Sequence, residues 1–91
     1  MSINKKPDQL EDGETCLVER VIRLVEEPRD GKKSWRVFFE DDPRTYYTMR
    51  AVNLYKPGDR VSCTIKASFY RDNLYLWVED FERVQKEELP L

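Results

Sequence analysis

The segment Arg60–Phe69, with the sequence RVSCTIKASF, alternates strictly between polar and apolar side chains and decides the fold class. Successive side chains of a β-strand point to opposite faces of a sheet, so this period of two predicts a strand with one buried face. The even-numbered residues are expected to face solvent. The side chains expected to face the core are Val61, Cys63, Ile65, Ala67 and Phe69.

Four further segments have the composition of strands, namely 15–26, 34–40, 45–51 and 74–80. The first of them is rich in β-branched residues, but simple alternation fails along it. We therefore expect a strand that bends at a bulge, and its β-branched content makes a helix over 15–27 the weaker alternative. Turns that contain Pro, Gly or Asp separate the segments.

The same parity rule predicts which side chains of these strands leave the core. In the second strand Arg36 and Phe38 are expected to face outward, opposite Trp35, Val37 and Phe39. In the third strand Tyr47, Met49 and Ala51 alternate with Tyr46, Thr48 and Arg50, and Tyr46 and Arg50 are expected to face outward. In the last strand the expected outward residues are Tyr75, Trp77 and Glu79.

Five short strands within residues 15–80 leave no room for a crossover helix and predict an antiparallel sheet. Such a sheet buries one face and removes its exposed edges by closing into a barrel. We predict an all-β fold, with a flexible leader over 1–14, a small five-stranded barrel over 15–81 and an acidic tail over 82–91. Met1–Lys6 has no apolar stretch typical of a secretory signal, so we expect an intracellular protein.

The charge is unevenly distributed along the 91 residues, although the net charge is only −2. Residues 43–71 contain six basic side chains and one acidic side chain, whereas 1–28 and 72–91 are acidic. A basic centre favours a polyanionic partner, because local potential governs such binding. The chain has no histidine, which excludes Ser–His–Asp catalysis and His-containing metal sites. We expect no enzyme activity and no cofactor or metal.

Aromatic and cationic side chains alternate on the predicted outward face, where a half-buried strand would normally be polar. Bases of single-stranded nucleic acid stack on aromatic rings, and cations neutralise the phosphates. The alternative interpretation is that these aromatics are structural, since they are good strand formers and form cross-strand pairs. The predicted binding residues are Lys32, Lys33, Arg36, Phe38, Tyr46, Arg50, Lys66, Tyr70, Arg71, Tyr75 and Trp77.

The order of the strands and the segment Leu54–Val61, LYKPGDRV, resemble the OB-fold superfamily of nucleic-acid-binding proteins, such as single-strand-binding and S1-like domains. The resemblance covers 15–80 and rests on the pattern rather than on a diagnostic motif. It implies a Greek-key barrel that binds single strands across its second and third strands, between two loops. The connection over 52–59 is shorter than in many OB domains, so an SH3-like small barrel is the alternative fold.

The resemblance also implies that the first and fourth strands pair, which would make Cys16 and Cys63 near neighbours in the interior. We expect both to be reduced core thiols, with a disulfide as the alternative. The residues Glu87, Glu88, Leu89, Pro90 and Leu91 resemble the partner-recruiting tail of bacterial single-stranded DNA-binding proteins, and an ordinary terminus is the alternative.

These observations predict a protein that binds single-stranded DNA or RNA with low sequence specificity. The alternative function is a protein-interaction module, a subunit or inhibitor of a larger complex. Aromatic and Arg side chains are also enriched at protein interfaces, and the acidic net charge favours this alternative.

Overall fold

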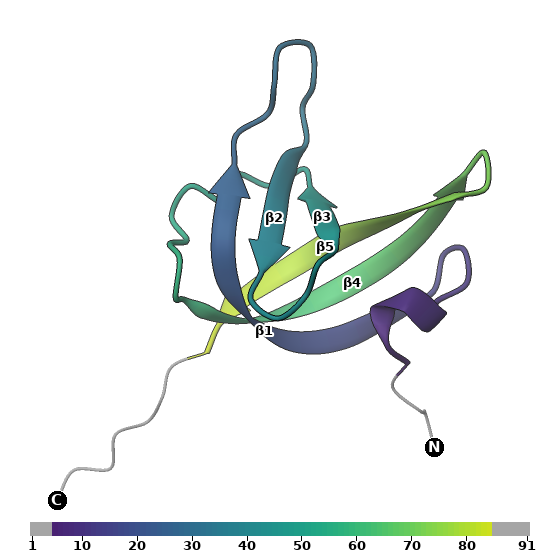
Figure 1. The fold of residues 1–91 in the computed structure, drawn as a ribbon, viewed down its shortest axis with the longest axis horizontal. Helices are drawn as coiled ribbons and strands as arrows, with labels where there is room; N and C mark the ends of the chain where they lie inside the picture. The colour runs from purple at the N-terminus through teal and green to yellow at the C-terminus, as the bar shows by residue number, and fades with distance from the viewer. Residues whose placement is uncertain (1–4, 85–91) are drawn as a thin grey trace, which may run out of the picture.

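The protein is described by a computed structural model over residues 5–84, and its five strands form a closed barrel (Figure 1). The strands are β1 (Thr15–Glu26), β2 (Trp35–Phe39), β3 (Thr45–Thr48), β4 (Arg60–Tyr70) and β5 (Asn73–Arg83). The predicted all-β barrel is confirmed. In the part of the chain that the structure describes, no helix has the length and hydropathy needed to cross a bilayer.

The strands follow one another around the barrel in the order β1-β2-β3-β5-β4. Every neighbouring pair is antiparallel except β3 and β5, which are parallel, with Tyr46 opposite Leu76 and Tyr47 opposite Trp77. The fully antiparallel sheet expected from the sequence is wrong in this one respect. A closed ring with an odd number of strands cannot alternate direction throughout, so one pair has to be parallel.

The long first strand, β1, pairs with two neighbouring strands. Residues 15–21 pair with β4, and residues 22–26 pair with β2. The register shifts between Ile22 and Leu24, which confirms the expected bulge. The bulge increases twist and lets β1 bend from one side of the barrel to the other, so that the barrel closes.

The interior of the barrel holds the odd-numbered residues of β4 from Val61 to Ala67, as the alternation predicted. The expected burial of Phe69 is wrong, because this side chain lies near the end of the β4–β5 hairpin and is 44% exposed. Cys16 and Cys63 are buried free thiols on β1 and β4, and they are near neighbours across this strand pair. Burial raises the pKa of both thiols, that of Cys63 to about 12. The interpretation as reduced core cysteines is therefore confirmed.

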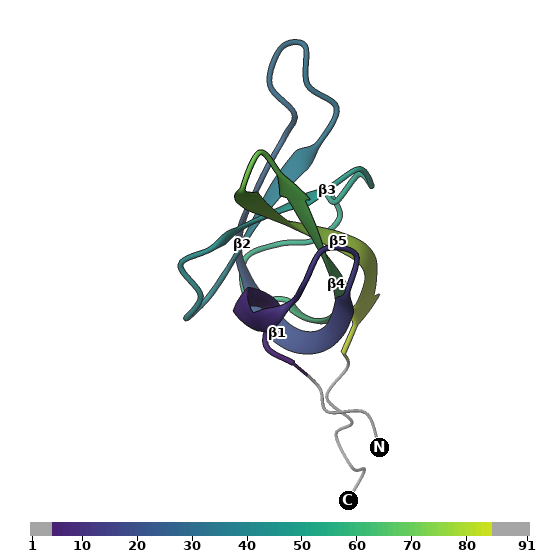
Figure 2. The same cartoon turned by 90° about the vertical axis from the view of Figure 1, so that its right-hand side faces the viewer.

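Residues 7–13, which lie within the leader expected over 1–14, pack against the barrel. A short 3-10 turn, η1 (Pro7–Gln9), is followed by Leu10, which is only 4% exposed (Figure 2). The Gly13 N–H donates to the Ala67 carbonyl over 2.9 Å. Parity reasoning cannot detect such a segment, because its two buried apolar residues, Pro7 and Leu10, do not alternate with polar residues along a strand.

The end of the barrel also differs slightly from the expected boundary at residue 81. Strand β5 continues to Arg83, which lies opposite Val61 of β4. The predicted partner tail over 87–91 lies outside the described residues.

Candidate nucleic-acid interface

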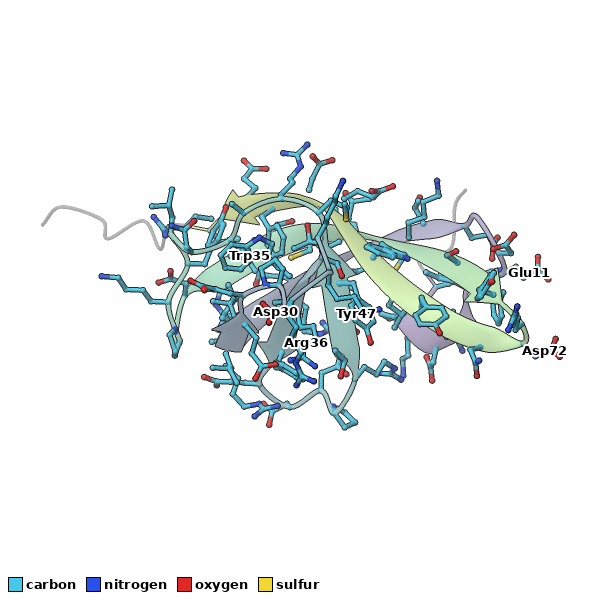
Figure 3. The ribbon with its side chains drawn as sticks, turned by 90° about the horizontal axis from the view of Figure 1, so that it is seen from above. Glu11, Asp30, Trp35, Arg36, Tyr47 and Asp72 are labelled. Atoms are coloured by element: carbon cyan, nitrogen blue, oxygen red, sulfur yellow. The ribbon has the colours of Figure 1, made fainter. Side chains whose placement is uncertain are left out.

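A groove of about 350 Å³ lies on the outer surface where β2, β3 and β5 meet the loop between β1 and β2. Three aromatic side chains, three cationic side chains and one serine surround it. Arg36 and Tyr47 are partners on neighbouring strands, and Figure 3 shows both near the middle of the molecule. The lining residues are Arg29, Lys32, Ser34, Arg36, Tyr47, Tyr75 and Trp77.

The strand register explains why aromatic and cationic side chains meet here. Arg36 lies opposite Tyr47, Tyr47 lies opposite Trp77, and Trp77 lies opposite Lys66. These four residues form a single row across β2, β3, β5 and β4. Because paired residues of neighbouring strands project to the same face, the register itself produces the alternation of cation and ring.

Tyr47 is the central ring of the groove. Its centroid lies 5.7 Å from that of Trp77 and 6.0 Å from that of Tyr75, with tilted ring planes in both pairs. All three rings are half-buried and keep part of their surface open to solvent. Each of the three side chains therefore has surface that a ligand can contact.

The cations of the groove differ in their partners. The Arg36 guanidinium is held by the Glu26 carboxylate at 2.6 Å, and only 24% of its side chain is exposed. Within residues 5–84, neither Arg29 nor Lys32 forms an ion pair. The Lys32 N–H donates to the Arg29 carbonyl at 2.8 Å, in a turn where Gly31 has a φ of 78°. This turn places two cations without an ion pair at the edge of the groove, on a loop that also carries the exposed acids Glu27 and Asp30.

Tyr46 does not belong to this surface, and its predicted outward orientation is wrong. The side chain is fully buried, and its ring meets that of Phe39 edge-on at a centroid distance of 4.9 Å. Its hydroxyl donates to Asp42 Oδ2 at 2.6 Å. Tyr47 occupies the outward position instead, because the parity of β3 is the opposite of the predicted one.

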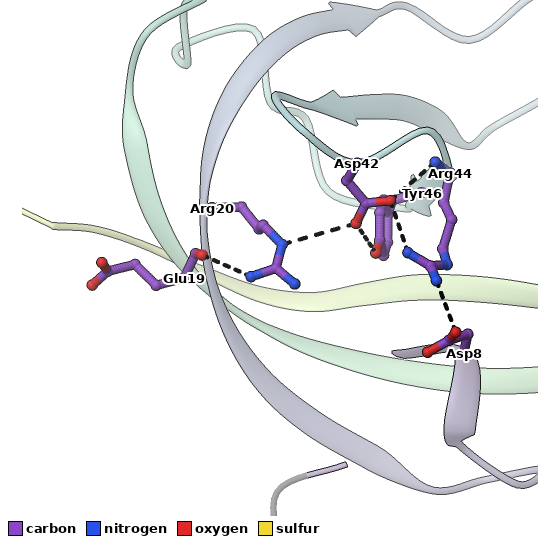
Figure 4. Close-up of polar contacts among 6 residues, drawn as sticks. All are labelled: Asp8, Glu19, Arg20, Asp42, Arg44 and Tyr46. Atoms are coloured by element: carbon purple, nitrogen blue, oxygen red, sulfur yellow. Dashed lines mark hydrogen bonds and ion pairs between the residues drawn. The ribbon is translucent and has the colours of Figure 1, made fainter. Parts of the chain in front are cut away.

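Asp42 is buried. Hydrogen-bond donors surround its carboxylate, as Figure 4 shows. The backbone N–H and the guanidinium of Arg44 each lie 3.0 Å from Oδ1, and Arg20 lies 3.8 Å from Oδ2. Burial alone would raise the pKa of Asp42, but the hydrogen bonds from Tyr46 and Arg44 lower it. Burial and the bond to Asp42 raise the pKa of Tyr46.

The remaining predicted residues lie outside the groove. Phe38 faces outward as expected but is covered by the Arg23 guanidinium, 5.4 Å from its ring. Arg50 lies beyond the end of β3 and pairs with Asp80 at 3.2 Å. The other predicted residues that do not line the groove are Lys33, Lys66, Tyr70 and Arg71, all exposed.

Four of the predicted residues are thus brought together, namely Lys32, Arg36, Tyr75 and Trp77. Sequence reasoning missed Arg29 and Ser34, which precede and follow the tip of the β1–β2 loop, and it placed Tyr47 in the core. The composition of the loop was the available signal for Arg29. For Tyr47 there was none, since residues 45–48 read Thr-Tyr-Tyr-Thr and put the same residue types on both faces.

Protein-family models, curated proteins and solved structures were compared with this chain, and none of them matches it.

Proposed function

We propose that this protein is an OB-like small barrel that binds single-stranded DNA or RNA with low sequence specificity. The strand order β1-β2-β3-β5-β4 is consistent with the OB-like architecture that the sequence resembles. The binding surface would be the groove on β2, β3 and β5 rather than the wider set of residues first predicted.

One observation carries the proposal, namely that the three rings and the three cations line the same groove. A ligand that fits both must present a flat aromatic group and a negative charge. A nucleotide has both, whereas a cationic ligand would be repelled by Arg29, Lys32 and Arg36. Stacking of one base on an aromatic side chain contributes roughly 1–3 kcal/mol and is tolerant of sequence.

Low specificity is expected because the groove is dominated by rings and charges. Sequence readout requires hydrogen-bonding groups that match the edges of bases. Ser34 is the only uncharged side chain of the described groove residues, apart from the rings, that has such a group. We therefore propose binding that depends on the backbone charge and on stacking.

The two tryptophans provide a direct test, because only one of them lines the groove. Trp77 lies beside Tyr47, whereas Trp35 packs against the core from the opposite face of β2. In a Trp35→Phe variant the remaining fluorescence comes from Trp77, and stacking by an oligothymidylate should quench it at low salt. In the matched Trp77→Phe variant the oligonucleotide should leave the fluorescence of Trp35 nearly unchanged.

Absence of quenching and of any change in the polarisation of a labelled oligonucleotide at low salt would contradict the proposal. That result would favour the alternative of a protein-interaction module, for which the same rings and Arg36 would serve as contacts.

A further inference from the structure

The groove is small, and it does not continue along β5, the strand that supplies the Tyr75 and Trp77 rings. We propose that it holds one base and the phosphates on either side of it, so that the binding site spans about three nucleotides. This inference rests on the proposed function and narrows it. An OB domain typically covers roughly 4–16 nucleotides, so a site of three would be unusually short.

The arrangement of the rings limits the number of bases. Tyr75 and Trp77 are two positions apart on β5, which places their Cα atoms about 6.7 Å apart along the strand. Tyr47 lies against both, at 6.0 Å and 5.7 Å, so the three rings form a compact cluster rather than a line. The planes of Tyr75 and Trp77 are tilted from that of Tyr47 by 56° and 45°, so the three rings do not form a flat shelf on which successive bases could stack.

The volume of the groove also limits the number of bases that it can hold. At about 350 Å³ it lies near the lower end of the roughly 300–1,000 Å³ that pockets for small molecules occupy. A path for several stacked bases would require a continuous surface beyond the rings, and the charges around the cluster argue against one.

Acidic side chains close the groove along β5. Beyond Trp77 the next outward residue is Glu79, followed by the exposed Asp80. The nearby cations are compensated by these acids, since Lys66 lies 3.9 Å from Glu79 and Arg50 lies 3.2 Å from Asp80. A phosphate that continued along the strand in this direction would therefore meet no net positive charge.

The β4–β5 hairpin does not extend the groove in the other direction. Figure 3 shows Asp72 at the tip of this hairpin, far from Arg36 and Tyr47. The Arg71 guanidinium lies over the Tyr70 ring, 5.3 Å from its centroid, so the two side chains contact each other instead of the groove. Among the groove residues that the structure describes, the cations without an ion pair are Arg29 and Lys32, and both are on the β1–β2 loop.

A length series measures the footprint. The affinities of oligothymidylates with three, six and twelve nucleotides are determined by competition against one labelled oligonucleotide at low salt. Each value is divided by the number of positions at which a three-nucleotide site can bind. We expect the corrected affinities to agree within about threefold, and we expect Tyr70→Ala and Arg71→Ala to leave them unchanged.

Three results are distinguishable. A corrected affinity that rises more than about threefold with length, or a loss of affinity in Tyr70→Ala, would overturn the short footprint while leaving single-strand binding intact. Equal corrected affinities together with normal binding by Tyr70→Ala would support it. If no oligonucleotide of any length binds, the proposed function itself fails, and the short footprint fails with it.

Discussion

Tyr47 of β3 lies directly opposite Trp77 of β5 across the parallel strand pair, and their ring centroids are 5.7 Å apart. A closed barrel with an odd number of strands needs at least one parallel pair, and the strand order places that pair at β3 and β5. The closure of the barrel therefore creates the aromatic centre of the proposed binding surface.

The Tyr47 ring should contribute directly to binding. Replacement Tyr47→Ala removes a stacking surface worth roughly 1–3 kcal/mol, so the affinity for an oligothymidylate should fall about 5- to 150-fold. Tyr47→Phe keeps the ring and should bind nearly as well as the wild type. Fluorescence polarisation measures both. Equal loss in the two variants would show that the hydroxyl, and not the ring, makes the contact.

The Tyr46 hydroxyl should contribute to stability and not to binding. Tyr46→Phe removes the donor to a nearly buried carboxylate, and we expect the free energy of unfolding to fall by about 1–3 kcal/mol. Tyr47→Phe is the matched control, because Tyr47 is half-buried and should change the free energy little. Urea unfolding followed by circular dichroism measures the difference. Equal stability of the two variants would contradict the assigned parity of β3.

Acid should weaken the barrel through Asp42. The folded pKa of this carboxyl is lowered from its usual value of 3.8, so its stabilising contribution is present above about pH 4 and is lost as pH falls through the folded pKa. Asp42→Asn should be less stable than the wild type at neutral pH, and the difference should shrink under acid conditions. Urea unfolding at several pH values checks this. A difference that stays constant down to about pH 2 would exclude a role for the charge.

The same hydrogen bond gives an opposite dependence at high pH. The folded pKa of Tyr46 is raised above its usual value of 10.0, so its contribution is complete below that value and is lost as pH rises through the folded pKa. The Tyr46→Phe variant should lack this alkaline loss.

The sequence predicted the strands correctly, but it assigned the side chains of β3 to the wrong faces of the sheet. In β4 the alternation is unambiguous, because every odd position is apolar. In β3, residues 45–48 read the same in either parity, and burial of Tyr46 depends on an acceptor that the β2–β3 turn provides. No local pattern reveals that Asp42 points inward, so the parity could not be read from the strand itself.

Both cysteines should be protected from modification in the folded protein. Cys16 and Cys63 are buried, and burial raises the pKa of both thiols, so little reactive thiolate is present near neutral pH. Ellman's reagent should react slowly with the native protein and rapidly with two thiols in denaturant. Rapid reaction without denaturant would show that the β1–β4 pair opens readily.

The dependence of the oligonucleotide affinity on salt concentration should show how many phosphates the cations of the groove neutralise. Arg29, Lys32 and Arg36 line it, and each neutralised phosphate of a single strand contributes about −0.7 to the slope of log K against log salt. Two phosphates flank the bound base, and Arg36 is already paired with Glu26, so we expect a slope of about −1.4. A slope of about −2 would require Arg36 to bind a third phosphate. Lys32→Ala should make the slope shallower by about 0.7, whereas Arg60→Ala should leave it unchanged, because Arg60 pairs with Glu19 away from the groove. Titration of a labelled oligothymidylate at several salt concentrations measures each slope. A slope much steeper than about −2 would mean that cations outside the groove contact the oligonucleotide. An equal change of slope in Lys32→Ala and Arg60→Ala would mean that the net charge of the protein, and not the groove, attracts the oligonucleotide.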